Sequence, residues 1–220
     1  MLIPSRAPHL CPDHSVQTGH VPFISRIVPA GRRAVLVEPA DPDTCADLAA
    51  WLRSRVVAGD VVPAAETVLV DGVDDVAAVV ALLDDWRPGE VAGAGELVEV
   101  PVTYDGPDLD DIAARWDMTT DEVVARHTSI EFVSRFCGFA PGFAYLSGLP
   151  DELAVSRLDT PRTSVPVGSV GLAGAWCGVY PTASPGGWRL LGRTNTTLWD
   201  ATREPPALLA PGIRVRFFPA

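Results

Sequence analysis

Arginine is the residue type that most clearly signals chemistry in this chain. Between Phe132 and Trp199 there are five arginines and only three acidic residues, although the whole chain has a net charge of −11. A guanidinium group binds a carboxylate or a phosphate through two parallel hydrogen bonds. The segment therefore predicts an anion site, although each arginine could instead pair with an acid or stack on an aromatic ring. The five are Arg135, Arg157, Arg162, Arg189 and Arg193.

His127 is the second candidate, because the other three histidines lie within the first 22 residues. Any histidine-based acid–base catalysis in the body of the chain would use it. It also falls at a predicted helix end, where the helix dipole stabilises a protonated imidazole, so a structural role competes with a catalytic one. Ser169 is conceivable as a nucleophile with His127 as its base. Its context, VGSV, does not match the G-x-S-x-G turn, and a serine hydrolase is therefore disfavoured.

Aromatic residues and rigid loops accompany the arginines. Glycine and proline recur every few residues from Gly138 onward, which permits tight turns and reduces the entropy lost on binding. Single aromatic residues usually belong to the core, but five of them beside such loops predict a pocket. They are Phe139, Phe143, Tyr145, Tyr180 and Trp188.

Several function classes are excluded by residues that the chain lacks. All 17 basic residues are arginine. Without lysine there is no Walker A loop and no Schiff-base lysine, so ATP would be handled by another route or by another chain. The histidines and the cysteine of the N-terminal segment match no zinc pattern, and no metal site is predicted. Cys137 and Cys177 have apolar surroundings and are expected to be buried, unreactive thiols.

The bulk properties indicate a globular chain without a nucleic-acid partner. An acidic protein repels phosphate backbones. The longest apolar run, Val76 to Leu83, is much shorter than the roughly 20 residues that cross a bilayer. The first residues lack the basic and apolar regions of a signal peptide. We therefore predict a cytoplasmic protein that makes no contact with a membrane.

The order of elements predicts an α+β fold in two domains. Residues 1–22 are expected to form a flexible extension, and residues 23–89 a small α/β domain. Its predicted elements are strands at 23–28, 34–38 and 67–70, a helix that begins at the cap Asp41, and a helix at 74–86. Residues 90–96 are rich in glycine and alanine and form the predicted linker.

Residues 97–220 form the second predicted domain. A strand at 97–104, a helix at 108–115 and a second helix, with a capping box at Thr119 and Glu122, precede a strand at 130–137. Further strands at 165–173, 188–191 and 213–218 are separated by turns. Many short strands of this kind predict a closed or partly closed β-barrel whose loops carry the binding residues.

One segment of this second domain resembles a known family. Residues 138–146, GFAPGFAYL, resemble the GF-x-PGF-x-YL segment of the family formed by KipI and the B-type subunits of 5-oxoprolinase, also called allophanate hydrolase subunit 1 or carboxyltransferase subdomain C. The likeness extends from about Val98 to Phe218 and is weaker upstream. Further blocks follow in the family's order: PR at 161–162, VP at 165–166, GSVGLAG at 168–174, GVYP at 178–181, SPGGW at 184–188 and GRT at 192–194.

The resemblance implies a ferredoxin-like domain followed by a cyclophilin-like barrel. It implies a protein that is inactive alone and works in a heteromer with a C-type partner and a third 5-oxoprolinase subunit. The assembly would use ATP to open 5-oxo-L-proline to L-glutamate. A lactam that bears a carboxylate suits an arginine-lined pocket, so the two arguments meet.

These arguments together give a set of candidate site residues. The catalytic candidates are His127, Arg162 and Ser169, and we expect Arg162→Ala to abolish activity without unfolding the chain. The candidates for substrate binding are Gly142, Phe143, Tyr145, Arg157, Tyr180, Trp188, Arg193 and Thr194.

Other activities stay open at this point. KipI-type relatives inhibit a sporulation histidine kinase, and fused relatives form the carboxyltransferase part of urea carboxylase. A prolyl isomerase would rest on the barrel fold alone. The family commonly has Gln-Thr where this chain has Trp176-Cys177, and this departure leaves the exact substrate open.

Overall fold

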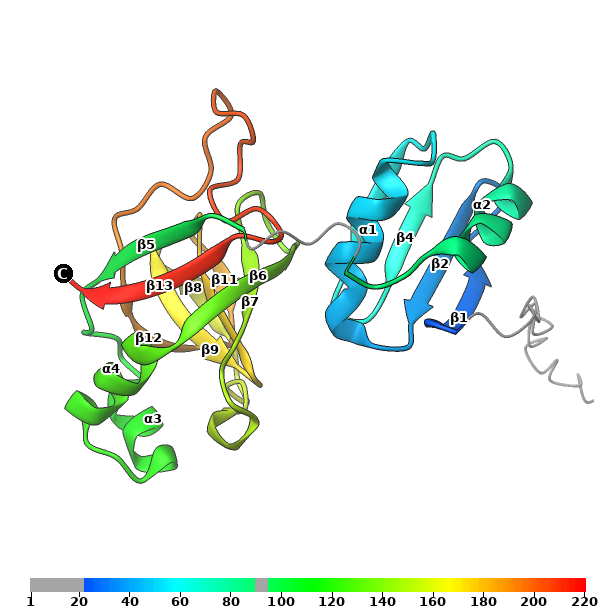
Figure 1. Cartoon of the computed structure of the whole chain (residues 1–220). Helices are drawn as coiled ribbons and strands as arrows, with labels where there is room; N and C mark the ends of the chain where they lie inside the picture. Colours follow the sequence, from blue (N-terminus) through cyan, green and yellow to red (C-terminus); the bar gives the residue numbers. More distant parts are fainter. Residues whose placement is uncertain (1–21, 90–94) are drawn as a thin grey trace, which may run out of the picture.

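The computed structural model describes residues 22–89 and 95–220. These residues form a four-stranded, a seven-stranded and a two-stranded sheet (Figure 1). No helix among them is long and apolar enough to cross a membrane. The predicted extension, except for its last residue, and most of the predicted linker lie outside the described residues. The predicted domain boundaries stay predictions.

The N-terminal sheet is antiparallel and pairs in the order β1-β2-β4-β3. Leu48, Trp51 and Leu52 form an apolar stripe of helix α1 and are buried with Trp86 in one core. Three of the four strands of this sheet were predicted from the sequence; the fourth, β3, has only four residues and was not predicted. The ferredoxin-like description of this part stays a prediction. Its elements are β1 (Ile24–Pro29), β2 (Ala34–Pro39), η1 (Pro42–Thr44), α1 (Cys45–Arg53), β3 (Asp60–Pro63), β4 (Val68–Asp71), α2 (Val76–Leu82) and η2 (Leu83–Asp85).

The seven-stranded sheet nearly closes on itself and so confirms the prediction of a closed or partly closed barrel. Its strands pair in the order β12-β9-β10-β7-β6-β13-β5. Just beyond β5, Thr103 exchanges two backbone hydrogen bonds of 2.9 Å with Arg193 at the end of β12. The two edges of the sheet therefore meet, and the cyclophilin-like description remains a prediction. The strands are β5 (Leu97–Val102), β6 (Glu131–Cys137), β7 (Ala144–Ser147), β9 (Ser169–Ala173), β10 (Trp176–Val179), β12 (Arg189–Arg193) and β13 (Arg214–Pro219).

The short strands of the barrel region were the least predictable. Strands β7 and β10 were not predicted, nor was the pairing of β8 (Arg162–Val165) with β11 (Ser184–Gly186). The strand predicted at 165–173 is interrupted at Gly168, which has a φ of 78°. A Cβ atom there would lie 2.0 Å from the Thr194 carbonyl oxygen, so the chain turns where only glycine fits.

Helices α3 (Leu109–Trp116) and α4 (Thr120–Ser129) lie together beside the barrel (Figure 1). The predicted capping box of α4 is confirmed, because the Thr119 and Glu122 side chains each bind the other's backbone N–H. Helix α3 differs. Asp108 stands at its N-cap position but makes no capping hydrogen bond, because its carboxylate is used elsewhere.

Candidate functional site

The aromatic residues predicted to form a pocket line one cavity of about 100 Å³. Phe139 and Phe143 come from the loop between β6 and β7, Tyr145 from β7, and Tyr180 from the residue after β10. This volume is well below the roughly 300 to 1,000 Å³ of pockets for drug-sized ligands, so the cavity suits a ligand of few atoms. The lining residues are Phe139, Phe143, Tyr145, Arg157, Tyr180, Gly186, Gly187 and Trp188.

The cavity wall is held by contacts between aromatic rings. The Phe143 ring lies 5.3 Å from both the Tyr180 and the Trp188 rings and 5.1 Å from the Tyr145 ring. All three contacts are edge-to-face, the arrangement that the ring quadrupoles favour, and each such pair is worth about 0.5–1.5 kcal/mol. Phe143, Tyr180 and Trp188 are buried. The wall is therefore rigid before any ligand binds.

Two backbone features shape the entrance to the cavity. Phe139 has a φ of 70°, a left-handed conformation that is costly for a bulky residue, and its side chain remains 61% exposed. Strained residues of this kind cluster at functional sites. At Gly186, a Cβ atom would lie 2.5 Å from the Tyr180 hydroxyl oxygen. The close approach of this loop to Tyr180 therefore requires glycine.

The arginines of the 132–199 segment divide sharply into paired and unpaired ones. Arg157 forms no ion pair or hydrogen bond with the part of the chain that the structure describes, although it lines the cavity. The other four are each paired with an aspartate: Arg135 with Asp43, Arg162 with Asp108, Arg189 with Asp111 and Arg193 with Asp105. The predicted anion site therefore narrows to Arg157.

Tyr180 provides a neutral hydrogen-bonding group in the same cavity. Burial raises the pKa of its phenol above the ordinary value, and the Trp188 backbone and Arg157 oppose this effect. The hydroxyl remains protonated at neutral pH. A ligand in the cavity would therefore meet a hydroxyl group, aromatic faces and one guanidinium group.

The structure does not bring His127 to this cavity. Its side chain is fully buried, its ring stacks on Phe217 with the centroids 4.8 Å apart, and burial lowers its pKa to about 3. The Tyr104 hydroxyl oxygen lies 2.7 Å from Nδ1, and Cys177 Sγ lies 3.5 Å from Nε2. Burial also raises the pKa values of Tyr104 and Cys177, so all three groups are neutral. His127 therefore lies outside the cavity as a buried, neutral group, and its catalytic role stays a prediction that this placement disfavours.

Ser169 is also placed away from the predicted chemistry. It is buried, and its hydroxyl donates to the Pro166 carbonyl oxygen at 2.8 Å. His127 has other partners, so the two do not form a nucleophile and base. The hydroxyl closes a turn after Pro166 instead.

Arg162 has a partner that changes its predicted role. Its guanidinium group donates to both carboxylate oxygens of Asp108, at 2.7 and 2.9 Å, and to the Trp188 carbonyl oxygen at 3.2 Å. Asp108 is buried. Because Arg162→Ala would leave this carboxylate without its cation, the expectation that the substitution spares folding is revised. We expect it to lower the free energy of unfolding by about 3 kcal/mol.

The remaining candidates lie around the cavity rather than in it. Gly142 makes a turn with a φ of 85°, where a Cβ atom would lie 2.8 Å from Trp199 Cβ. Arg193 and Thr194 line a separate depression of about 370 Å³ with Thr103. Sequence reasoning missed Asp108 and Asp111 as partners, although two acids at the start of a helix beside an arginine-rich segment were a usable signal.

Residues 25–209 match the protein family described as carboxyltransferase domain, subdomain C and D. The chain belongs to this family. It is 46% identical over 138 residues to the B subunit of 5-oxoprolinase from Escherichia coli O157:H7. The matched region covers 61% of this chain and 63% of that protein. The chain is 44% identical over 124 residues to the B subunit of 5-oxoprolinase from Bacillus subtilis strain 168, covering 55% and 52%. The chain thus matches less than two thirds of the length of these relatives.

Solved structures show the same fold. The crystal structure of TTHA0988 has a TM-score of 0.73 and 32% identity, covering 86% of this chain and 40% of that one. The urea amidolyase of Kluyveromyces lactis has a TM-score of 0.67 and 19% identity, covering 93% of this chain and 15% of that one. The second likeness concerns the fold alone. Both structures place this fold within a longer chain.

Trp176 and Cys177, which stand where the family commonly has Gln-Thr, lie behind the cavity wall. Trp176 contacts Tyr145 edge-on, with the ring centroids 6.1 Å apart, and Phe136 in the same way at 5.5 Å. Cys177 points to His127 in the core. Neither residue lines the cavity. Trp176 therefore supports the cavity wall from behind, where it packs on Tyr145 and on the cluster that contains Phe143 and Trp188.

Proposed function

We propose that this chain is the B-type subunit of a heteromeric, ATP-dependent 5-oxoprolinase, which opens 5-oxo-L-proline to L-glutamate. The observation that carries the proposal is the unpaired Arg157 at the aromatic cavity, in a chain whose relatives are named as B subunits of 5-oxoprolinase. A small ring with a carboxylate matches both parts of the site. The ring would pack on Trp188 and Phe143, and the carboxylate would bind the Arg157 guanidinium group.

ATP does not fit this chain's own cavity. A volume of about 100 Å³ is too small for a nucleoside triphosphate, and the chain has no lysine for a phosphate loop. No group of three or more potential metal ligands occurs in residues 22–89 and 95–220. We therefore assign ATP to a partner protein and derive no step through it. The role proposed for this chain is to bind and orient the lactam.

The face beside the cavity supports a partner protein. Phe139 and Val167 are 61% and 63% exposed, and Trp199 is 41% exposed. Val167 and Trp199 line a second depression of about 250 Å³, which shares Tyr180 with the cavity. Large exposed apolar residues near a site commonly mark a protein contact. We propose that a C-type partner covers this face and that a third protein completes the assembly in the cytoplasm.

A carboxyltransferase reaction of the urea-carboxylase type is the second candidate. The family description and the fold shared with urea amidolyase favour it. It differs in substrate, because urea bears no carboxylate and would make no use of Arg157. The choice between the two activities can therefore be made on substrate charge.

Reconstitution tests the proposal. The chain is co-expressed with the C-type partner and the third protein of the same genome, and glutamate formed from 5-oxo-L-proline and ATP is measured with each of the three omitted in turn. We expect glutamate only when this chain is present. A stable complex that consumes urea but not 5-oxo-L-proline would contradict the proposal and favour the second candidate.

A further inference from the structure

The loop that carries Arg157 is fixed on both sides of that residue. It connects η3 (Asp151–Leu153) to β8. The carbonyl oxygen of Ser156 accepts a hydrogen bond of 2.9 Å from Arg189 Nε. The backbone N–H of Leu158 donates to the Gly187 carbonyl oxygen at 2.8 Å. The backbone at Arg157 is therefore held while its side chain has no partner among the described residues.

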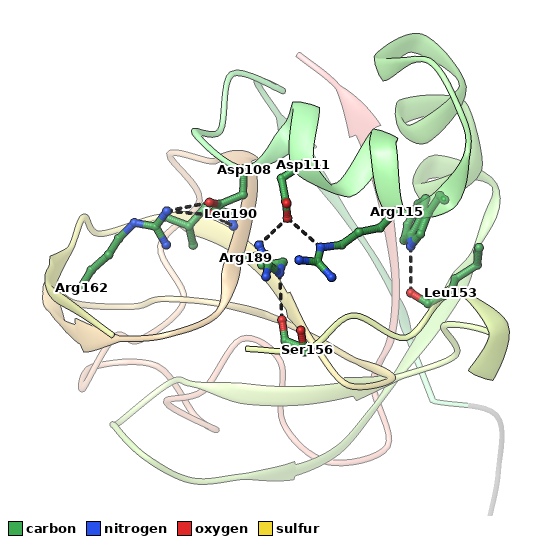
Figure 2. A network of polar contacts seen from close by, with 9 residues as sticks. Asp108, Asp111, Arg115, Leu153, Ser156, Arg162, Arg189 and Leu190 are labelled. Carbon is green, nitrogen blue, oxygen red and sulfur yellow. Dashed lines mark hydrogen bonds and ion pairs between the residues drawn. The ribbon is translucent and has the colours of Figure 1, made fainter. Parts of the chain in front are cut away.

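Arg189 connects this loop to helix α3 (Figure 2). Its guanidinium group donates through Nε to the loop and through Nη1 to the Asp111 carboxylate. The Arg189 side chain is only 9% exposed. Asp111 also accepts a hydrogen bond of 2.9 Å from Arg115 Nε, one helical turn away. Among the described residues Arg115 makes no hydrogen bond or ion pair with the loop, so only one of the two arginines bound to Asp111 is also bonded to the loop.

A second connection holds the cavity wall in the same way. Asp108 accepts two hydrogen bonds from Arg162, at the far end of the loop, and one of 2.7 Å from the Leu190 backbone N–H. Arg162 in turn binds the carbonyl oxygen of Trp188, which lines the cavity. Figure 2 shows Asp108 bound to Arg162 and to Leu190, and Asp111 bound to Arg189, which reaches Ser156. Two aspartates at the start of one helix thus fix both the loop and the wall.

We infer that Asp111 and Arg189 are positioning residues that hold the Ser156 carbonyl and thereby aim Arg157 at the carboxylate of the ligand. This inference rests on the proposed function. Because the backbone on both sides of Arg157 is already fixed, binding has to order only the Arg157 side chain and not the loop.

The test compares Arg189→Met with Arg115→Met in the assembled complex. Both substitutions remove an arginine bound to Asp111, but only the first releases the loop. We expect Arg189→Met to raise the KM for 5-oxo-L-proline about tenfold with kcat changed less than about twofold, and Arg115→Met to leave both constants unchanged. Arg189→Lys, which keeps a charge for Asp111 but lacks the fork, should raise KM about threefold and serves if the methionine variant does not fold.

The decisive readout is the effect of Arg189→Met in an Arg157→Met background. If Arg189 acts through Arg157, the second substitution adds less than about twofold to the KM of the first. Full additivity of the two effects would overturn the inference and leave Arg189 with a purely structural role. An unchanged KM in Arg189→Met would also overturn it. The proposed function is tested separately by the wild-type complex. If that complex turns over 5-oxo-L-proline, the proposed function stands even where the inference about Arg189 fails; if it does not, the proposed function is contradicted.

Discussion

Two aromatic clusters of the barrel contain similar residues and differ in access. Around His127, the rings of Tyr104, Phe132 and Phe217 form a sealed cluster in which the titratable groups are neutral. Around Tyr180, the rings of its neighbours leave a cavity with an unpaired guanidinium group. Histidine is the more familiar catalytic residue, yet here it lies in the sealed cluster. The candidate site differs from the His127 cluster because a ligand can reach it and because it holds an unpaired charge. Residue type does not separate the two.

The same substitution in each cluster tests this distinction. Tyr104→Phe removes the hydroxyl beside His127 Nδ1 and leaves a buried ring nitrogen unsatisfied. We expect it to lower the free energy of unfolding by about 2 kcal/mol, measured by urea denaturation, with unchanged activity of the folded protein. Tyr180→Phe should lower kcat/KM about fivefold with little effect on stability. Loss of activity without loss of stability in Tyr104→Phe would reverse the comparison.

The pH dependence of stability probes the sealed cluster alone. The folded-state pKa of His127 is about 3, below its unfolded value of about 6.5, so the unfolded chain binds the proton first. Stability is therefore present above pH 6.5 and is lost as the pH falls towards 3. Between pH 6.5 and pH 5 the buried His127 should lower the free energy of unfolding by about 1.5 kcal/mol. Most carboxylates titrate at a lower pH than this interval.

His127→Gln is the control for that measurement. It keeps a hydrogen-bonding side chain but removes the titrating group. Urea denaturation at about pH 6.5 and about pH 5 should show a loss for the wild-type chain that the variant lacks. Equal losses in both proteins would mean that His127 is protonated in the folded state and that the cluster is open.

The smallest effect is expected at Trp176, which lies behind the cavity wall. Trp176→Gln introduces the residue common in the family. Because Trp176 supports the wall but does not line the cavity, we expect less than about a threefold change in the KM for 5-oxo-L-proline. Steady-state kinetics of the complex measure this, and a change of more than about tenfold would place Trp176 in the site.

The aromatic wall could be predicted from the sequence because its residues lie beside glycine- and proline-rich turns within one segment. The pairing of the arginines could not. Arg162 and Arg189 pair with Asp108 and Asp111, which are 54 and 78 positions away and outside the segment in which charge was counted. The apparent positive charge of that segment is therefore mostly neutralised in the fold.

His127 shows the same limit. The helix that ends close to it was predicted, and α4 does end at Ser129. Its burial depends on Phe217, which belongs to the last strand of the barrel. Local patterns locate a helix end, but they do not reveal which distant strand covers it.

The central claim is that Arg157 recognises a carboxylate, and a comparison of two ligands tests it most directly. The kcat/KM for 5-oxo-L-proline and the inhibition constant of 2-pyrrolidinone, the same lactam without the carboxylate, are measured for the wild-type complex and for Arg157→Met. Arg126→Met, a change at an exposed arginine of α4 outside the cavity, is the control. Two charge-assisted hydrogen bonds of about 1.5 kcal/mol each predict a loss of about 100-fold for 5-oxo-L-proline. The inhibition constant of 2-pyrrolidinone should change less than about twofold. The account would be contradicted if Arg157→Met weakened inhibition by 2-pyrrolidinone by the same factor by which it lowered the kcat/KM for 5-oxo-L-proline. Full activity of Arg157→Met would contradict it too.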